Sequence, residues 1–299
     1  MEFAVCIWGL DRPEETAQDL SSQGVTAVES GPKFFIEKDE ETIERAAQAF
    51  REAGIKIFSV HAPFGEQEDL SALDPSVRGN AINVHKRLLE KVALAGAKVM
   101  IVHPGRHASA DDIPKMEEIL PSSLEEVLEA AEQTGVKLAL ENMLPEHPGY
   151  SSETVRRIVE GINSPFLGVC FDTGHAHVNK EGEIAAFDNL KDLIIAFHLQ
   201  DNDSTHDMHL QPPYGTVNWD KLAPMIKELN FQDPMAVEAM PWGGVDFGMM
   251  LREIKALFGD GLLEVELNGF KAKAICPRCG RYIFKSGNGW FCGCGDHRR

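Results

Sequence analysis

Residues 137–172, KLALENMLPEHPGYSSETVRRIVEGINSPFLGVCFD, contain the pattern that decides the fold. A short apolar run at 137–141 is followed by a polar loop, a helical pattern at 152–161 and a second apolar run at 167–172. Short runs that are apolar almost throughout are typical of parallel strands buried on both faces. The segment therefore predicts one strand–helix–strand unit.

The same unit recurs along the whole chain. Strands are predicted at 2–8, 26–30, 55–60, 98–102, 137–141, 167–172, 194–199 and 235–239. Helices are predicted between and after them, at 14–22, 40–53, 76–95, 116–133, 152–161, 183–192, 219–229 and 246–257. Eight strands alternating with eight helices predict an α/β fold, a (β/α)₈ TIM barrel, which usually takes about 250 residues. A doubly wound open sheet is the alternative.

Composition and charge describe a globular chain with an acidic body. Of the 299 residues, 43% are hydrophobic and 25% charged, which excludes disorder throughout. The net charge is −18, but residues 271–299 hold seven Lys or Arg and one Asp, which leaves −24 on the first 270 residues. Such a body repels phosphate backbones, so nucleic acid is not the expected partner, although a local basic site would escape this argument.

Membrane and export signals are not expected in this sequence. No apolar stretch approaches the roughly 20 residues of a membrane span. Near the N-terminus, Asp11 and Arg12 come too early for a signal peptide. Six cysteines in a chain of this size then indicate reduced thiols and a cytoplasmic location, without a membrane partner. Assembly into a homo-oligomer stays open.

Six consecutive predicted strands finish in an acidic or histidine side chain. These side chains are His61, His103, Glu141, Asp172, His198 and Glu238. The carboxyl ends of all strands in a TIM barrel meet at one rim, so these side chains are expected to converge there. Buried carboxylates are costly unless they are paired or bind a metal. The pattern predicts a divalent metal, with Mn²⁺, Zn²⁺, Co²⁺ and Mg²⁺ all suited to mixed carboxylate and imidazole ligands.

Glu141, Asp172, His198 and Glu238 form the predicted ligand set. Further histidines and acids either line the pocket or hold additional ions; these are His61, His103, His175, Asp207 and His209.

Seven short motifs together resemble the xylose-isomerase-like barrels, a superfamily that includes sugar-phosphate isomerases and epimerases as well as endonuclease IV (AP endonuclease family 2). They are VHAPF (60–64), VHPG (102–105), LEN (140–142), FDTGHAH (171–177), HLQDND (198–203), DMH (207–209) and VEAMP (237–241). The resemblance covers about residues 1–258 and implies the same four metal ligands. In the epimerase branch the two glutamates also act as acid and base, and the histidine matching His175 contacts a substrate oxygen. In endonuclease IV, residues matching His61, His103, His175, Asp207 and His209 complete a three-zinc cluster.

Two features favour the small-molecule branch. The loop at 65–69, GEQED, is acidic where a DNA-binding enzyme needs basic groups, and the body of the chain is acidic too. Against this, Arg106 and His107 could engage a phosphate. We therefore expect a metal-dependent isomerase or epimerase of a sugar or sugar phosphate, acting on a small carbohydrate through an enediolate, with Glu141 and Glu238 as acid and base. The alternative is an endonuclease IV-like zinc phosphodiesterase acting at abasic DNA sites.

The last residues form a basic, cysteine-rich tail. Cys276 and Cys279 are spaced C-x-x-C, and Cys292 and Cys294 follow as C-x-C. Four thiolates suit a closed structural Zn²⁺ site, and so short a segment needs the metal to fold. The chain is thus predicted to divide into a barrel, 1–262, and a zinc-ribbon-like tail, 271–299, which docks on the acidic barrel or on a partner.

Overall fold

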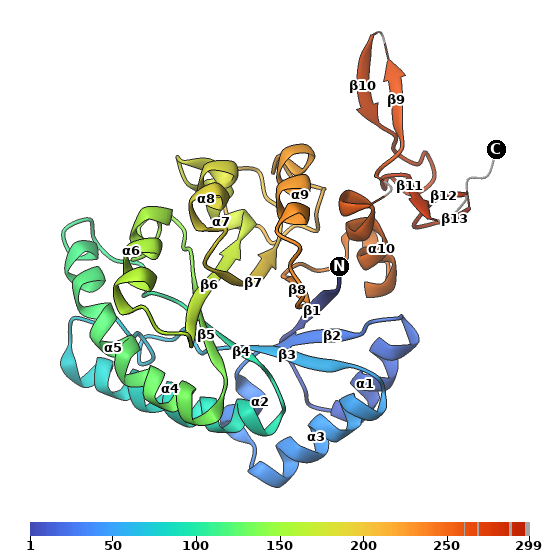
Figure 1. The fold of residues 1–299 in the computed structure, drawn as a ribbon. Helices are drawn as coiled ribbons and strands as arrows, with labels where there is room; N and C mark the ends of the chain where they lie inside the picture. Colours follow the sequence, from blue (N-terminus) through green and yellow to red (C-terminus); the bar gives the residue numbers. More distant parts are fainter. Residues whose placement is uncertain (260, 268, 287–288, 297–299) are drawn as a thin grey trace.

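The computed structural model describes residues 1–259, 261–267, 269–286 and 289–296. Eight parallel strands, each paired with the next in sequence, form a closed barrel (Figure 1). They are β1 (Phe3–Ile7), β2 (Ala27–Ser30), β3 (Lys56–His61), β4 (Val99–Val102), β5 (Lys137–Glu141), β6 (Leu167–Asp172), β7 (Ile194–Leu199) and β8 (Met235–Val237). Pairing of β8 with β1 closes the ring, so the TIM barrel is confirmed and the open sheet is excluded.

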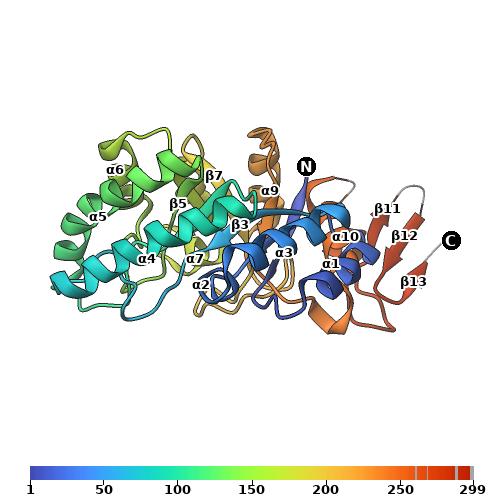
Figure 2. The same cartoon turned by 90° about the horizontal axis from the view of Figure 1, so that it is seen from below.

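Helices cover the outside of the barrel (Figures 1 and 2). They are α1 (Pro13–Ser22), α2 (Lys33–Glu37), α3 (Glu40–Glu52), α4 (Pro75–Leu94), α5 (Ile113–Thr134), α6 (Ser152–Ile162), α7 (Thr173–Val178), α8 (Gly182–Leu190), α9 (Trp219–Glu228) and α10 (Phe247–Phe258). In the described part of the chain, none is both long and apolar enough to cross a membrane.

Two short helices were not predicted from the sequence. The helix α2 lies in the loop after β2, and α7 starts directly after β6. Asp172 caps α7, because its Oδ1 accepts a hydrogen bond from the backbone N–H of His175 at 2.7 Å. Helices this short leave no amphipathic period to read in a sequence. The cap turns the chain at the barrel rim and brings His175 to the site.

The core has two parts, one on each face of the sheet. Large apolar side chains on the outer face of the barrel pack against the helices. The interior is filled by smaller clusters, which include Ala4, Cys6, Ala27, Ala139, Cys170, Ala196 and Ala236. Cys6 and Cys170 are therefore core residues.

The chain continues beyond α10 into a small β-rich segment beside that helix (Figures 1 and 2). A hairpin joins β9 (Glu264–Leu267) to β10 (Phe270–Lys273), and β11 (Phe284–Ser286), β12 (Gly289–Cys292) and β13 (Gly295–Asp296) form a second sheet. Residue 260 of the predicted barrel, and residues 287–288 and 297–299 of the predicted tail, lie outside the described residues. The division at 262 and 271 stays a prediction.

The four cysteine thiols of the tail meet at one point. Their sulfur atoms all lie within 4.8 Å of one another, with Cys276 and Cys294 at 3.4 Å and Cys279 and Cys292 at 3.7 Å. Four thiolates at about 2.3 Å from a tetrahedral Zn²⁺ are about 3.8 Å apart. The cluster is consistent with the predicted zinc-ribbon-like tail.

Candidate active site

The alternation of side chains along each strand directs the predicted ligands into the barrel. Residues two apart in a strand face the same side of a sheet. The interior residues Ala139, Cys170, Ala196 and Ala236 each lie two positions before one of the ligands Glu141, Asp172, His198 and Glu238. The strand register places Asp172 opposite His198. The four side chains therefore share the mouth of the barrel.

These four residues form one compact, fully buried group. One ligand atom from each lies within 4.8 Å of the other three. His198 Nδ1 is 2.8 Å from Glu141 Oε1, 3.0 Å from Glu238 Oε2 and 3.8 Å from Asp172 Oδ2. Ligand atoms that share an ion at about 2.1 Å are about 3.0–3.4 Å apart. The donor set and its spacing fit a divalent cation.

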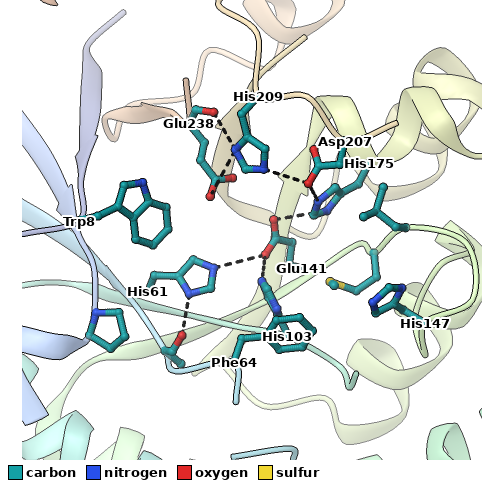
Figure 3. Close-up of a pocket in the computed structure, with 14 residues that line it drawn as sticks. Trp8, His61, Phe64, His103, Glu141, His147, His175, Asp207, His209 and Glu238 are labelled. Carbon is teal, nitrogen blue, oxygen red and sulfur yellow. Dashed lines mark hydrogen bonds and ion pairs between the residues drawn. The ribbon is translucent and has the colours of Figure 1, made fainter. Parts of the chain in front are cut away.

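A second group adjoins the first and shares Glu141 with it. His61, His103 and Glu141 offer atoms within 4.8 Å of one another, and Figure 3 shows both imidazoles directed at the Glu141 carboxylate. Glu141 Oε2 is buried and lies 2.8 Å from His103 Nε2 and 3.8 Å from His61 Nε2. Among the described residues it has no partner in hydrogen-bond geometry. A carboxylate oxygen held this way fits a second cation bridged by Glu141.

The three remaining candidates meet at Asp207. Its Oδ2 atom lies 2.9 Å from His209 Nε2 and 3.5 Å from His175 Nε2 (Figure 3). The two histidines approach the carboxylate from different sides, and the set is looser than the two groups around Glu141. His209 Nδ1 also contacts the backbone oxygen of Glu238 at 3.2 Å. This arrangement links the loop after β7 to the ligand that follows β8.

The carboxylates of the buried group are stable in their ionised form only when a positive charge lies next to them. Burial raises the pKa of Asp172 to about 7. Burial opposes the charge on His198, yet Cys170, Glu238 and Glu29 raise its pKa well above the ordinary value. Burial also opposes the charge on Glu238, but His198 outweighs it and lowers the pKa of that carboxyl to about 2. A cluster that holds its carboxylates ionised only beside a cation is suited to metal binding.

Glu29 is the site residue that sequence reasoning missed. It is buried on β2, and its Oε1 lies 2.9 Å from His198 Nε2. Ser59 Oγ donates a hydrogen bond of 2.7 Å to the other oxygen. Glu29 thus fixes the imidazole so that Nδ1 faces the other ligands. An acidic residue inside the apolar run at 26–30 was the signal that could have found it.

A cavity of about 400 Å³ opens above these groups. Figure 3 shows its walls, where Trp8 and Phe64 stand among the histidines. The Phe64 ring packs against His103 with centroids 4.0 Å apart, and Trp8 lies 5.6 Å from His61. None of the 14 described lining residues is lysine or arginine. Positive charge in the cavity would therefore come from bound cations or from histidine side chains, and not from lysine or arginine.

The basic pair after β4 has structural partners. Arg106 donates to the backbone oxygen of Phe64 at 3.0 Å, and its guanidinium lies 5.5 Å from the Phe64 ring centroid. His107 contacts Glu146 at 3.0 Å on the surface. In the acidic loop 65–69, Asp69 is buried and accepts hydrogen bonds from Ser71. Neither feature reaches the cavity lining.

Comparison with known proteins finds relatives of this chain and solved structures with the same fold. The uncharacterised protein MJ1311 of Methanocaldococcus jannaschii is 32% identical over 194 residues, which cover 60% of this chain and 63% of that protein. A probable endonuclease 4 of Staphylococcus epidermidis is 27% identical over 68% of this chain and 73% of its own length. The crystal structure of 3-keto-D-glucoside 4-epimerase from E. coli superimposes with a TM-score of 0.72 and 18% identity, covering 85% of this chain and 99% of that one.

The family comparison covers most of the barrel. Residues 17–261 match the xylose isomerase-like TIM barrel family. That range includes β2 to β8 and with them all nine barrel residues predicted as ligands or pocket residues. The chain belongs to the xylose isomerase-like TIM barrel family.

Proposed function

We propose that this protein is a divalent-metal-dependent isomerase or epimerase of a small sugar. The observation that carries the proposal is the buried group of Glu141, Asp172, His198 and Glu238 at the floor of a cavity of about 400 Å³. Cavities of this size suit small molecules. The epimerase from E. coli shares the fold and adds to the plausibility of this reaction class.

The lining of the cavity favours a neutral sugar over a sugar phosphate. Phosphate recognition usually relies on Arg or Lys side chains, and none is among the described lining residues. Trp8 and Phe64 offer apolar ring faces beside the metal-ligating groups. A ketose or a cyclic polyol ketone, with adjacent carbonyl and hydroxyl oxygens, has the matching chemistry.

The proposal assigns proton transfer to the two glutamates. Glu141 reaches the site from β5 and Glu238 from the end of β8. One carboxylate takes the proton from the carbon beside the carbonyl, and the bonding electrons move to the carbonyl oxygen. The other carboxyl group returns a proton to carbon or oxygen. When bound, a divalent cation lowers the energy of the negative charge that develops on the substrate oxygens.

The test is solvent-proton exchange into candidate substrates. The full-length protein, supplied with Mn²⁺, Co²⁺, Zn²⁺ or Mg²⁺, is incubated in D₂O with ketoses, ketose phosphates and inososes. We expect deuterium beside the carbonyl of a neutral sugar. Glu141→Gln and Glu238→Gln should each lower exchange by about 100-fold or more, while His107→Gln, at an exposed position, should not. Unchanged turnover in both glutamate variants would refute the assignment.

A second candidate is metal-assisted phosphodiester hydrolysis. It is favoured by the second group at His61 and His103 and by the Asp207 cluster, because neighbouring cations can clamp both oxygens of a displacement. The relatedness to a probable endonuclease 4 supports it as well. Metal analysis separates the two: apart from the tail zinc, one ion per chain supports the sugar reaction. Three ions, together with cleavage of abasic DNA, support hydrolysis.

A further inference from the structure

We propose that the zinc-ribbon-like tail helps to shape the barrel mouth. It does so through Arg281, a positioning residue that holds in place the loop carrying Asp207 and His209. The proposal goes beyond the reaction and applies to either candidate function. It assigns the tail a role within its own chain, where a basic, cysteine-rich segment would ordinarily suggest an external partner.

Arg281 is buried in the contact between the tail and the barrel. Only 1% of its surface is exposed, and it pairs with Glu253 on α10, which is also buried. Arg281 Nε donates to Glu253 Oε1 at 3.0 Å, and Nη2 donates to Oε2 of the same carboxylate. A buried two-pronged pair fixes the direction of both side chains, because neither can be exposed alone without leaving a buried charge unpaired.

The same guanidinium reaches the loop between β7 and α9. Its Nη2 lies 3.3 Å from Gln211 Oε1, and Gln211 Nε2 donates to Glu253 Oε2 at 2.7 Å. The Tyr214 hydroxyl contacts Glu253 at 3.2 Å and accepts a hydrogen bond from the backbone N–H of Tyr282 in the tail. The Arg281 guanidinium also lies 5.3 Å from the Tyr214 ring centroid. Two residues of this loop are thus anchored through the tail.

The anchored segment is continuous with the site. Gln211 comes two residues after His209, whose backbone has a φ of 47°. For a residue other than glycine this left-handed conformation is strained and persists only when its surroundings hold it. The loop after β8 is tied to the same point, because the backbone N–H of Trp242 donates to Gln211 Oε1 at 2.8 Å. Loosening Gln211 would therefore release His209 and disturb the chain that follows Glu238.

The zinc-binding half of the tail packs directly on Arg281. Gly293 stands between Cys292 and Cys294, and a Cβ atom added there would lie 2.6 Å from Arg281 Cδ and 3.0 Å from its Nε. Because residue 293 is a glycine, the backbone between the two cysteines can pack against the aliphatic part of the Arg281 side chain. This contact couples the fold of the tail, which the thiol cluster organises, to the position of the guanidinium.

The test is hydrogen–deuterium exchange of the full-length, zinc-loaded protein. Gly293→Ala displaces the arginine without altering a thiol or a charge, and Arg281→Lys keeps the charge opposite Glu253 but loses the two-pronged contact. In both variants we expect amides in 203–216 to exchange about tenfold faster or more. Peptides from 61–73, across the rim, should be unchanged, and Zn²⁺ binding at the barrel should weaken by a similar factor.

The matched control is Lys273→Gln. Lys273 also joins the tail to the barrel, through Asp220 at 2.6 Å, but this pair is partly exposed and joins β10 to α9, outside the loop. The control should leave exchange in 203–216 unchanged. The proposal is overturned if both test variants leave that loop protected, or if peptides 61–73 and 203–216 lose protection equally. If Arg281→Lys does not fold, the same comparison of amide exchange in 203–216 and 61–73 is made with Gly293→Ala and with the wild-type protein stripped of tail zinc.

Discussion

Glu141 belongs to both ligand groups at the barrel mouth. One of its oxygens contacts His198 and the other contacts His103, so the two ligand groups share it. Its pKa lies well below the ordinary value, because the neighbouring histidines outweigh its burial. Glu141→Ala should therefore lower the amount of metal that the barrel retains more than Asp172→Ala does, as measured by metal analysis after gel filtration. Equal losses in the two variants would contradict a shared ligand.

Glu29 allows a test of how His198 is oriented. Replacing Glu29 by Gln keeps its size but removes the charge next to His198 Nε2. We expect a 10- to 100-fold loss of metal affinity, the usual effect of altering such a supporting residue. Isothermal titration with Zn²⁺ or Mn²⁺ measures it. The control is Ser59→Ala, which removes only the hydrogen bond to the far oxygen of Glu29 and should change the affinity less.

The sequence predicted most directly that the side chains at the strand ends converge. Glu141, Asp172, His198 and Glu238 follow apolar runs, and the common rim of a barrel makes their convergence a consequence of the fold. Glu29 escaped because it lies within a strand and supports a ligand across the barrel. Glu29 and His198 are 169 positions apart in the sequence, so no local spacing indicates that they contact each other.

At the scale of elements, the strands and long helices were predicted closely because their patterns are long and periodic. The predicted 137–141, 167–172 and 194–199 coincide with β5, β6 and β7. The helices α2 and α7 and the hairpin β9–β10 were not predicted. Each is only a few residues long, and α7 depends on a cap supplied by Asp172, itself a predicted ligand.

The helix α4 carries a buried histidine, His85, which should make the free energy of unfolding depend on pH. Burial lowers the pKa of His85 from 6.5 to about 4. Between those values the unfolded chain binds more protons than the folded one, so stability falls as pH falls. From pH 7 to pH 5 the contribution of His85 to the free energy of unfolding should drop by about 2 kcal/mol.

Urea unfolding of His85→Gln measures this effect. The variant should lose about 2 kcal/mol less than the wild type over the same pH change. The exposed His206 provides the control, because His206→Gln should keep the pH dependence of the wild type. A His85→Gln profile parallel to that of the wild type would show that His85 is not the titrating group.

At the scale of the whole molecule, closure of the barrel followed from the number and alternation of its units. What the sequence did not reveal was how the tail joins the barrel. The prediction rested on a net charge of +6 for residues 271–299, whereas the closest contact is one buried pair, Arg281 with Glu253. Whether a charged residue is buried depends on tertiary packing, which composition does not record.

The tail should respond to zinc as a cooperative unit with its docking site. Removal of zinc from the proposed thiol site by a chelator should lower the thermal midpoint of the protein, because the buried Glu253 would lose its partner. The double variant Arg281→Met with Glu253→Gln removes both charges and should reduce this sensitivity to chelator. Differential scanning calorimetry with and without a chelator compares the two proteins, and equal shifts would argue against coupling through this pair.

The central claim is that the barrel mouth binds a divalent cation between Glu141, Asp172, His198 and Glu238. The most direct measurement is an anomalous difference map from crystals of the full-length protein grown with Zn²⁺ or Mn²⁺. The account predicts a peak within about 2.0–2.3 Å of an oxygen or nitrogen from each of the four side chains. A map with a peak at the cysteine cluster and none in the barrel would contradict it.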